Sequence, residues 1–450
     1  MIAATKLLLP DGDLALHERL ATALVSAIDN GAFKPGERLP THRRLAERFG
    51  VSIGTVTRAV DALSDRGLVR GEIGRGTFVL DRSAPSDAND IVDLTINAPP
   101  PLLGYEALAE AAEIATRRAL QLANGGYVDH SGTDAQRSVV AGWLTGTRQT
   151  VTADEIVLTN GAQQGIHLAF AALKDRSATI ATEGATFPGA IAAAANLGLT
   201  MLPVLTDGEG MLPDALDAVL AANHCKIIYT TPVCQNPLGF ETGPERRRAI
   251  AAVATNHGAT IVEDDIYGLY AAKGSLTYKD IAPDNTIFVT SLSKSLTPLV
   301  RLGVIVPPRP MRAGIAKRMR AESWGLPPFV AELSVALIET GAATRIAAQL
   351  RDEAMARQLM AQQIFNIASL PMPQGAPHIW LPMSPLAAER LARRASEAKV
   401  RITPPGATIV GASGIGGVRL CIMAPPARSG LERGLFILAG LLGSEEDVIV

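Results

Sequence analysis

The stretch that decides the fold is SLSKSLTPLVRLG, residues 291–303. Its lysine, Lys294, carries an amine that can form a Schiff base, and serine hydroxyls stand on both sides of it. Arg301 follows in the same stretch and offers a guanidinium that can hold a phosphate group. A reactive amine beside phosphate-binding groups predicts a site for pyridoxal phosphate.

The chain on both sides of this stretch alternates short apolar segments with alanine-rich helical ones. We expect strands at residues 155–159, 178–182, 226–230, 259–263, 286–290 and 302–306. This alternation predicts an α/β domain with a mostly parallel sheet that helices cover on both faces. We assign residues 92–450 to that domain, since 450 residues suffice for two or three domains.

Distinctive side chains follow nearly every predicted strand. In chain order they are Ala162 and Gln163, Phe187, Asn236, Asp264, and Ser291 with Lys294. Open α/β sheets bind ligands at the carboxyl ends of their strands, so five strand ends should converge on one site. The first of these segments, GAQQ at residues 161–164, should open a helix whose backbone amides can hold a phosphate.

In order and spacing these segments resemble the fold-type I aminotransferases related to aspartate aminotransferase, from about residue 92 to the C-terminus. The resemblance implies that Lys294 forms the Schiff base with the cofactor and that Asp264 pairs with its pyridinium nitrogen. The other implied ring contacts are hydrogen bonds from Asn236 and Tyr267 and stacking by Phe187. The implied phosphate contacts are Ser291, Arg301, the amides of Ala162 and Gln163, and Tyr127 from a second subunit.

Arg419, in the segment GVRL, matches the arginine that binds an amino acid's carboxylate in these enzymes. Each residue also has an ordinary structural role open to it. Asp264 can cap a helix, Asn236 can form a turn, and Phe187 can belong to the core. Lys294 can be a surface lysine and Arg419 a structural arginine, so the joint pattern carries the prediction.

Residues 1–80 follow a different pattern. Apolar residues at helical spacing predict a first helix over residues 14–30. Thr41 can cap a short second helix that Gly50 ends, and Ser52 can cap a third. Two strand-like pieces follow, with a turn at Gly74-Arg75-Gly76. Three helices and a hairpin predict a winged helix-turn-helix.

In that architecture the third helix enters the major groove with its first residues toward the base edges. The residues expected at DNA are Ser52, Thr55 and Thr57, flanked by Arg43 and Arg58. Residues 34–75 contain nine basic and five acidic residues, a basic excess that suits DNA. A solvated basic surface on a small helical domain is the alternative interpretation.

Three segments in order, LPTHRRLA (39–46), VSIGTV (51–56) and GRGTFV (74–79), resemble the GntR family of bacterial regulators. The resemblance implies that Arg43, Ser52, Thr55, Thr57 and the wing residue Gly76 face DNA. Many family members carry arginine after the serine, where this chain has Ile53. Operator preference is therefore not transferable.

Joined by a polar linker at residues 81–91, the two parts resemble the MocR-type regulators. That organisation implies a transcription factor that binds operator DNA and senses an amino compound, or pyridoxal phosphate itself. The alternative is an active aminotransferase. Three departures weigh mildly against efficient turnover: Ala162 lacks a hydroxyl, Phe187 replaces the commoner tyrosine, and Leu238 stands where threonine is usual.

Composition narrows the classes of protein to which this chain can belong. The net charge is −2, and three cysteines without ligand spacing predict neither disulfides nor a metal site. No export signal and no membrane-spanning run is apparent, so we expect a cytoplasmic protein. The aminotransferase resemblance further implies a homodimer, and hence two DNA half-sites.

Overall fold

The chain divides into two compact units, which we call the head (Met1–Asp90) and the body (Ile91–Val450). The computed structural model describes residues 15–29, 32–33, 36–65, 68–72, 76–79, 91–123, 125–272, 274–366 and 375–443. The expected linker, apart from its last residue, Ile91, and the turn residues Gly74 and Arg75 lie outside the described residues.

Three helices build the core of the head: α1 (Leu16–Asp29), α2 (His42–Phe49) and α3 (Ile53–Asp65). Leu24, Leu45 and Leu63, one from each helix, are fully buried in a single apolar cluster. Both predicted ends of α2 are confirmed. Thr41 Oγ1 accepts a hydrogen bond from the Arg44 amide at 3.4 Å, and Gly50 closes the helix in the left-handed conformation.

A two-stranded antiparallel wing follows, formed by β1 (Val69–Glu72) and β2 (Gly76–Val79). Gly76 has φ of +115°, and a Cβ there would overlap the Arg38 guanidinium. The backbone at this position therefore requires glycine. Three helices and a wing confirm the predicted winged helix-turn-helix.

The body is organised around a seven-stranded sheet in the order β4-β12-β11-β10-β9-β5-β6. Its strands are β4 (Val157–Asn160), β5 (Thr179–Glu183), β6 (Thr200–Val204), β9 (Ile227–Thr230), β10 (Thr260–Asp264), β11 (Thr286–Ser291) and β12 (Leu302–Val306). Only β12 runs antiparallel to its neighbours, so the predicted mostly parallel sheet is confirmed. The six predicted strands agree to within two residues. The edge strand β6 was not predicted; it contains Pro203, which an edge tolerates.

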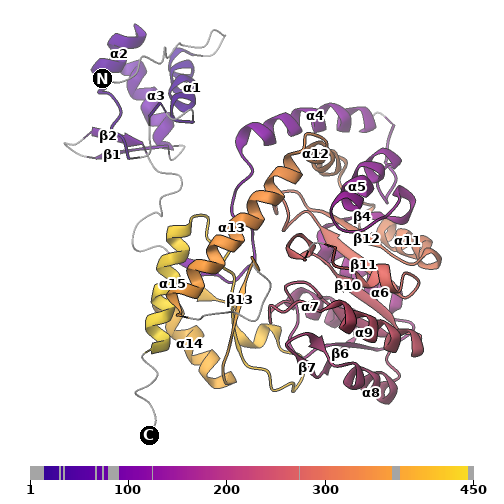
Figure 1. The fold of residues 1–450 in the computed structure, drawn as a ribbon. Helices are drawn as coiled ribbons and strands as arrows, with labels where there is room; N and C mark the ends of the chain where they lie inside the picture. Colours follow the sequence, from indigo (N-terminus) through magenta and orange to yellow (C-terminus); the bar gives the residue numbers. More distant parts are fainter. Residues whose placement is uncertain are drawn as a thin grey trace. The chain divides into compact units, whose positions relative to one another are not determined.

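Helices cover both faces of this sheet (Figure 1). They are α4 (Tyr105–Ala123), α5 (Asp134–Thr147), α6 (Gly161–Leu173), α7 (Pro188–Asn196), α8 (Pro213–Asn223), α9 (Pro244–Asn256), α10 (Tyr278–Ile281), α11 (Arg312–Ser323) and α12 (Pro328–Glu339). Alternate residues of β11 belong to opposite cores. Phe288 packs with α4, α5 and α12, whereas Ile287 and Val289 pack with α6, α7 and α11.

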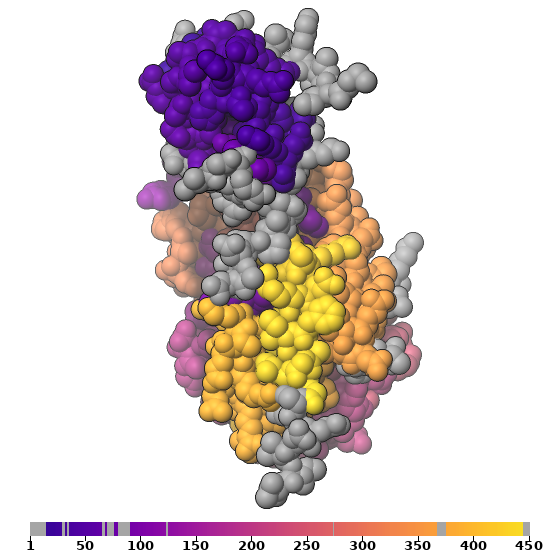
Figure 2. All heavy atoms as spheres, turned by 90° about the vertical axis from the view of Figure 1, so that its left-hand side faces the viewer, coloured from indigo at the N-terminus to yellow at the C-terminus, as the bar shows by residue number. Residues whose placement is uncertain are grey.

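The C-terminal part of the body contains α13 (Ala342–Ile364), α14 (Pro385–Glu397), α15 (Arg428–Gly443), β13 (Ile379–Pro382), β14 (Val400–Ile402) and β15 (Gly417–Leu420). The long helix α13 connects it to the sheet (Figure 1), and α15 packs against α13 and α14 (Figure 2). The first strand of the body, β3 (Val92–Leu94), pairs with β14. This pairing brings the segment after β3 to the large sheet's ligand edge.

Short elements complete the body. They are the hairpin β7 (Thr206–Asp207) and β8 (Gly210–Met211) and the 3-10 helices η1 (Ala153–Glu155), η2 (Gly268–Tyr270), η3 (Arg309–Met311) and η4 (Pro405–Thr408).

Candidate cofactor site and DNA-binding surface

A cavity of about 410 Å³ lies at the carboxyl edge of the large sheet. Its walls include every residue of the body that was predicted to bind the cofactor or effector, except Tyr127: Ala162, Gln163, Phe187, Asn236, Asp264, Tyr267, Ser291, Lys294, Arg301 and Arg419. The antiparallel direction of β12 explains why Arg301 is among them. Arg301 precedes β12, and the beginning of an antiparallel strand lies where its parallel neighbours end.

Lys294 lies in the loop after β11, half-buried beside the cavity. Burial lowers the pKa of its ammonium to about 8. Nζ donates a hydrogen bond to the carbonyl of Asn97, which follows β3. An amine with this pKa is partly neutral near pH 7 to 8, and the neutral form is the nucleophile.

Asp264 ends β10 and faces the same cavity with 2% of its surface exposed. Tyr229 donates its hydroxyl proton to Oδ2 at 2.7 Å, and the amide of Ile266 donates to Oδ1 at 3.3 Å. Burial raises the pKa of the Asp264 carboxyl to about 6. The two hydrogen bonds do not offset the cost of burying this carboxylate. A cationic nitrogen in the cavity would therefore stabilise its charged form.

Tyr267 is oriented by a chain of buried hydrogen bonds that the sequence did not reveal. Asn97 Nδ2 donates to the Tyr267 hydroxyl and to His378 Nδ1, both at 2.9 Å. Burial lowers the pKa of His378 to about 3, so the ring is neutral, with its proton on Nε2 shared with the Gln235 carbonyl at 3.0 Å. Tyr267 accepts from Asn97 and keeps its own proton to donate into the cavity.

Several groups that can bind anions line the cavity or lie next to it. Helix α6 begins there at Gly161, where an added Cβ would lie 2.9 Å from Nη2 of Arg301. Ser293, 3% exposed, also lines the cavity, and its hydroxyl has no hydrogen-bond partner among the described residues. A buried hydroxyl without a partner costs free energy, so a bound anion would relieve it. Ser293 was missed by sequence reasoning although it adjoins Lys294.

Arg419, on β15, is 6% exposed and firmly held. Its guanidinium donates to Thr403 Oγ1 at 2.9 and 3.2 Å, to the Thr95 carbonyl at 2.7 Å, and to Asn236 Oδ1. Because Asn236 accepts with its oxygen, its Nδ2 remains available as a donor. Phe187 stands at the start of α7, against Gly189 and Gln163.

Tyr127 is the predicted site residue that lies elsewhere. Its side chain is 87% exposed, and its ring lies against Trp324 with the centroids 5.1 Å apart. It does not line the cavity of its own chain.

On the head, Gly76 lies on strand β2 of the wing, and the other predicted DNA-facing residues lie at the N-terminal half of α3 and on α2. Ser52 caps α3, because its Oγ accepts from the Thr55 amide at 3.1 Å. The Thr55 hydroxyl is buried and lies 2.9 Å from the same oxygen, so a local hydrogen bond already engages it. Thr57 is half-buried, and its Oγ1 donates to the Ile53 carbonyl at 3.1 Å.

Arg43 and Arg58 are both exposed on this surface. The largest apolar group there is Ile53, whose side chain is 53% exposed at the first position of α3. The sequence marked Ile53 only as a departure from an arginine. Its exposure adds a residue of a type that contacts the thymine methyl group.

Each of the two units matches a known protein family. Residues 89–435 match the aminotransferase class I and II family, and residues 16–79 match the gntR family of bacterial regulatory proteins. Among the described residues, none of the helices has the length and apolar character that crossing a membrane requires.

Two similar proteins are named as transcriptional regulators. The uncharacterized HTH-type transcriptional regulator YdeF of Bacillus subtilis is 26% identical over 443 residues, which cover 95% of this chain and 94% of YdeF. The HTH-type pyridoxine biosynthesis transcriptional regulator PdxR of Corynebacterium glutamicum is 29% identical, with 68% and 69% covered.

Solved structures share the fold of the body. The α-aminoadipate aminotransferase LysN of Thermus thermophilus superposes with a TM-score of 0.71 and 25% identity, covering 80% of this chain and 94% of LysN. An archaeal alanine:glyoxylate aminotransferase gives the same score at 21% identity, with 80% and 92% covered.

Proposed function

The chain belongs to the aminotransferase class I and II family and carries a gntR-family DNA-binding domain; on that premise we propose a transcriptional regulator whose body binds pyridoxal phosphate at Lys294. One observation carries the proposal. A lysine amine of lowered pKa, a buried carboxyl, an arginine, and a buried hydroxyl without a partner among the described residues line one cavity.

Each chemical group of the cofactor would have contacts among these residues. Ser291, Ser293, Arg301 and the first amides of α6 would hold its phosphate. Asp264 would pair with the ring nitrogen, Tyr267 and Asn236 Nδ2 would donate to the ring oxygen, and Phe187 would stack on the ring. When bound, pyridoxal phosphate supplies an aldehyde for the Lys294 amine and a ring that withdraws electrons from an attached amino compound.

The effector we propose is an amino compound with a carboxylate, or pyridoxal phosphate itself. The Arg419 guanidinium would bind the carboxylate through two parallel hydrogen bonds. To do so it would give up its hydrogen bond to the Thr95 carbonyl. The Lys294 bond to the Asn97 carbonyl ties the loop after β11 to the segment after β3. Loading the cavity would change that bond, and DNA binding would respond if the two states differ in affinity for DNA.

The proposed partner of the head is double-stranded operator DNA, read by two copies of the chain on two half-sites. The exposed aromatic pair of Tyr127 and Trp324 supports a homodimer, because exposed apolar side chains that lie together can mark a protein–protein interface. Tyr127 would then reach the phosphate site of the second subunit. Names of similar proteins, such as the pyridoxine biosynthesis regulator PdxR, support regulation as the role.

The second candidate function is amino-group transfer. It is favoured by the presence of Lys294, Asp264 and Arg419 in one cavity. Ala162, Phe187 and Leu238 weigh mildly against rapid turnover, as noted from the sequence.

The test is a titration of purified protein with pyridoxal phosphate and then with a panel of amino acids. We record the visible spectrum, keto-acid release and affinity for the gene's own promoter DNA. A spectral change with altered DNA affinity and without keto acid supports the regulator; steady keto-acid release supports the enzyme. Lys294→Ala should lose the spectrum, and exposed Lys317→Ala is the matched control. Promoter binding indifferent to cofactor and to Lys294→Ala would overturn the sensing role.

A further inference from the structure

A second cavity of about 660 Å³ lies behind the Lys294 loop. It is lined by the end of α5, the segment after β10, the Lys294 loop and the first half of α13, with Trp143, Arg148, Asp265, Leu269, Ser295 and Arg351 among its walls. No step of the function proposed above uses it.

Successive residues divide between the two cavities. Asp264 faces the first and Asp265 the second; Lys294 faces the first and its neighbour Ser295 the second. Ser291 and Ile266 line both. The two cavities therefore share one wall, formed by the strand ends that carry the reactive lysine and the buried carboxyl.

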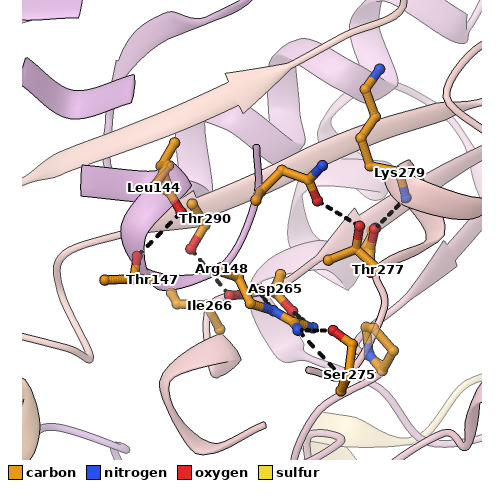
Figure 3. A network of polar contacts seen from close by, with 12 residues as sticks. Leu144, Thr147, Arg148, Asp265, Ile266, Ser275, Thr277, Lys279 and Thr290 are labelled. Carbon is orange, nitrogen blue, oxygen red and sulfur yellow. Dashed lines mark hydrogen bonds and ion pairs between the residues drawn. The ribbon is translucent and has the colours of Figure 1, made fainter. Parts of the chain in front are cut away.

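The only carboxylate among the described walls of the second cavity is already saturated. Arg148 donates to both oxygens of Asp265 at 2.9 Å and to the Ser275 carbonyl at 2.7 Å (Figure 3). The Thr290 hydroxyl donates to the Asp265 carbonyl at 3.1 Å (Figure 3). A cationic ligand would find no free acceptor of comparable strength in Asp265, because a bidentate arginine already neutralises it.

The groups left without partners are donors. Ser295 is 7% exposed, and neither its hydroxyl nor the buried indole Nε1 of Trp143 has a hydrogen-bond partner among the described residues. Arg351 is exposed on α13 and forms no ion pair with the rest of the described chain. With the Arg148–Asp265 pair neutral, Arg351 leaves the walls with a net positive charge, and indole and guanidinium can only donate.

We propose that the second cavity binds a small organic carboxylate. Its oxygens would accept from Arg351, Ser295 and Trp143, and its apolar part would lie against Leu144 and Leu269. Binding there would be felt at Lys294 because Ser295 is the next residue in the same loop. The inference goes beyond the proposed function, since it requires neither cofactor nor DNA.

The test uses the full-length chain labelled with 5-fluorotryptophan, whose three tryptophans give separate fluorine resonances. Trp143→Phe assigns the resonance of interest. Titration with benzoate should shift that resonance saturably, whereas the neutral isostere benzamide should not. Arg351→Gln should weaken benzoate binding about tenfold or more, as expected for loss of a charge-assisted contact. Arg345→Gln, on the same helix but outside the walls, should leave it unchanged.

Ser295→Ala gives a second, milder readout, with binding weakened about threefold to tenfold. Equal shifts with benzoate and benzamide, or no saturable shift with either, would overturn the proposal. So would undiminished binding in Arg351→Gln, because a carboxylate held only beside Arg419 would be indifferent to that change. None of these outcomes depends on pyridoxal phosphate, so failure here leaves the proposed function standing.

Discussion

The head and the body arrange their functional residues in opposite ways. On the head, Ser52 and Arg58 bond within one helical turn, to Thr55 and to the Gly54 carbonyl. The hydrogen bond between Thr57 and His42 reaches farther, across 15 positions of sequence. In the body, Arg419 bonds to Thr95 across 324 positions of sequence. Surface contacts of the head can therefore be changed without loss of its core, whereas changing a polar residue of the body's cavity such as Arg419 or Asp264 also changes buried polar bonds.

The largest effect that this contrast predicts is at Asp264. Asp264→Ala should weaken pyridoxal phosphate binding about 100-fold or more, because breaking a buried ion pair costs about 3 to 5 kcal/mol. The visible titration of the cofactor measures it. Asp264→Asn, which preserves shape and the bond from Tyr229, is the control and should recover folding but little affinity. Full affinity in Asp264→Asn would remove the ring-nitrogen contact from the proposal.

The sequence could place Asp264 because parallel strands end at one edge, a rule that needs only the apolar runs and the residues after them. The same rule found Lys294 and Asn236. It could not find Asn97 or His378, because their positions depend on the pairing of β3 with β14 and of β13 with β15. No local spacing reports such pairings.

Local signals were equally effective in the head, where Thr41, Gly50 and Ser52 were recognised as ends of helices from their immediate neighbours. In the head, the sequence could not predict the direction in which each side chain points. Thr55 was expected at a base edge, but the turn geometry around Ser52 buries its hydroxyl. Ile53 was noted as a missing arginine, although its position leaves it exposed at the start of α3.

His378 tests whether the body's long-range bonds are structural as well as functional. His378→Ala removes the acceptor of Asn97 and the donor to the Gln235 carbonyl, both buried. Loss of these partners should lower the free energy of unfolding by about 2 to 4 kcal/mol. Denaturant unfolding measures the change. His378→Gln, which can restore one donor and one acceptor, should recover part of it; an unchanged midpoint in both variants would contradict the bonding chain.

Buried carboxyls give the body a pH dependence. Burial raises the pKa of Glu183 to about 7 and that of Asp264 to about 6, and it also raises that of Glu263. These groups bind protons more readily in the folded body than in the unfolded chain. Stability without cofactor should therefore rise as pH falls from about 8 to about 5, although His378, with its lowered pKa, opposes the trend.

Glu183→Gln isolates one of these contributions. At pH 8 it should stabilise the protein by about 1 to 3 kcal/mol, since the charged carboxylate is no longer held in a buried site. Thr230 donates to Oε1 of Glu183 and Thr182 to Oε2, so in the variant one threonine keeps an oxygen acceptor and the other faces the amide NH2, from which its hydroxyl can accept. At pH 5 the variant and the parent should have nearly equal midpoints. A constant difference across that range would show that packing, and not the charge, is responsible.

For the head, the variants test which exposed residues contact DNA. Arg58→Gln should weaken promoter binding about tenfold and reduce the salt slope by about one, as loss of one phosphate contact does. Its exposed position predicts no change in the midpoint of unfolding. Fluorescence anisotropy at several salt concentrations measures both quantities. A matched variant, Arg390→Gln on α14 of the body, should change neither.

The smallest predicted effect is at Ser52, where two variants can separate its role as the cap of α3 from its role in DNA binding. Ser52→Ala removes the cap of α3 and should destabilise the head by about 1 kcal/mol. Ser52→Asp keeps a capping oxygen and should retain stability, yet its charge opposes DNA phosphates and should weaken promoter binding at low salt. If Ser52→Asp bound DNA as the parent does, Ser52 would be a cap alone. Loss of DNA binding in Ser52→Asp at unchanged stability would assign it to the DNA-facing surface.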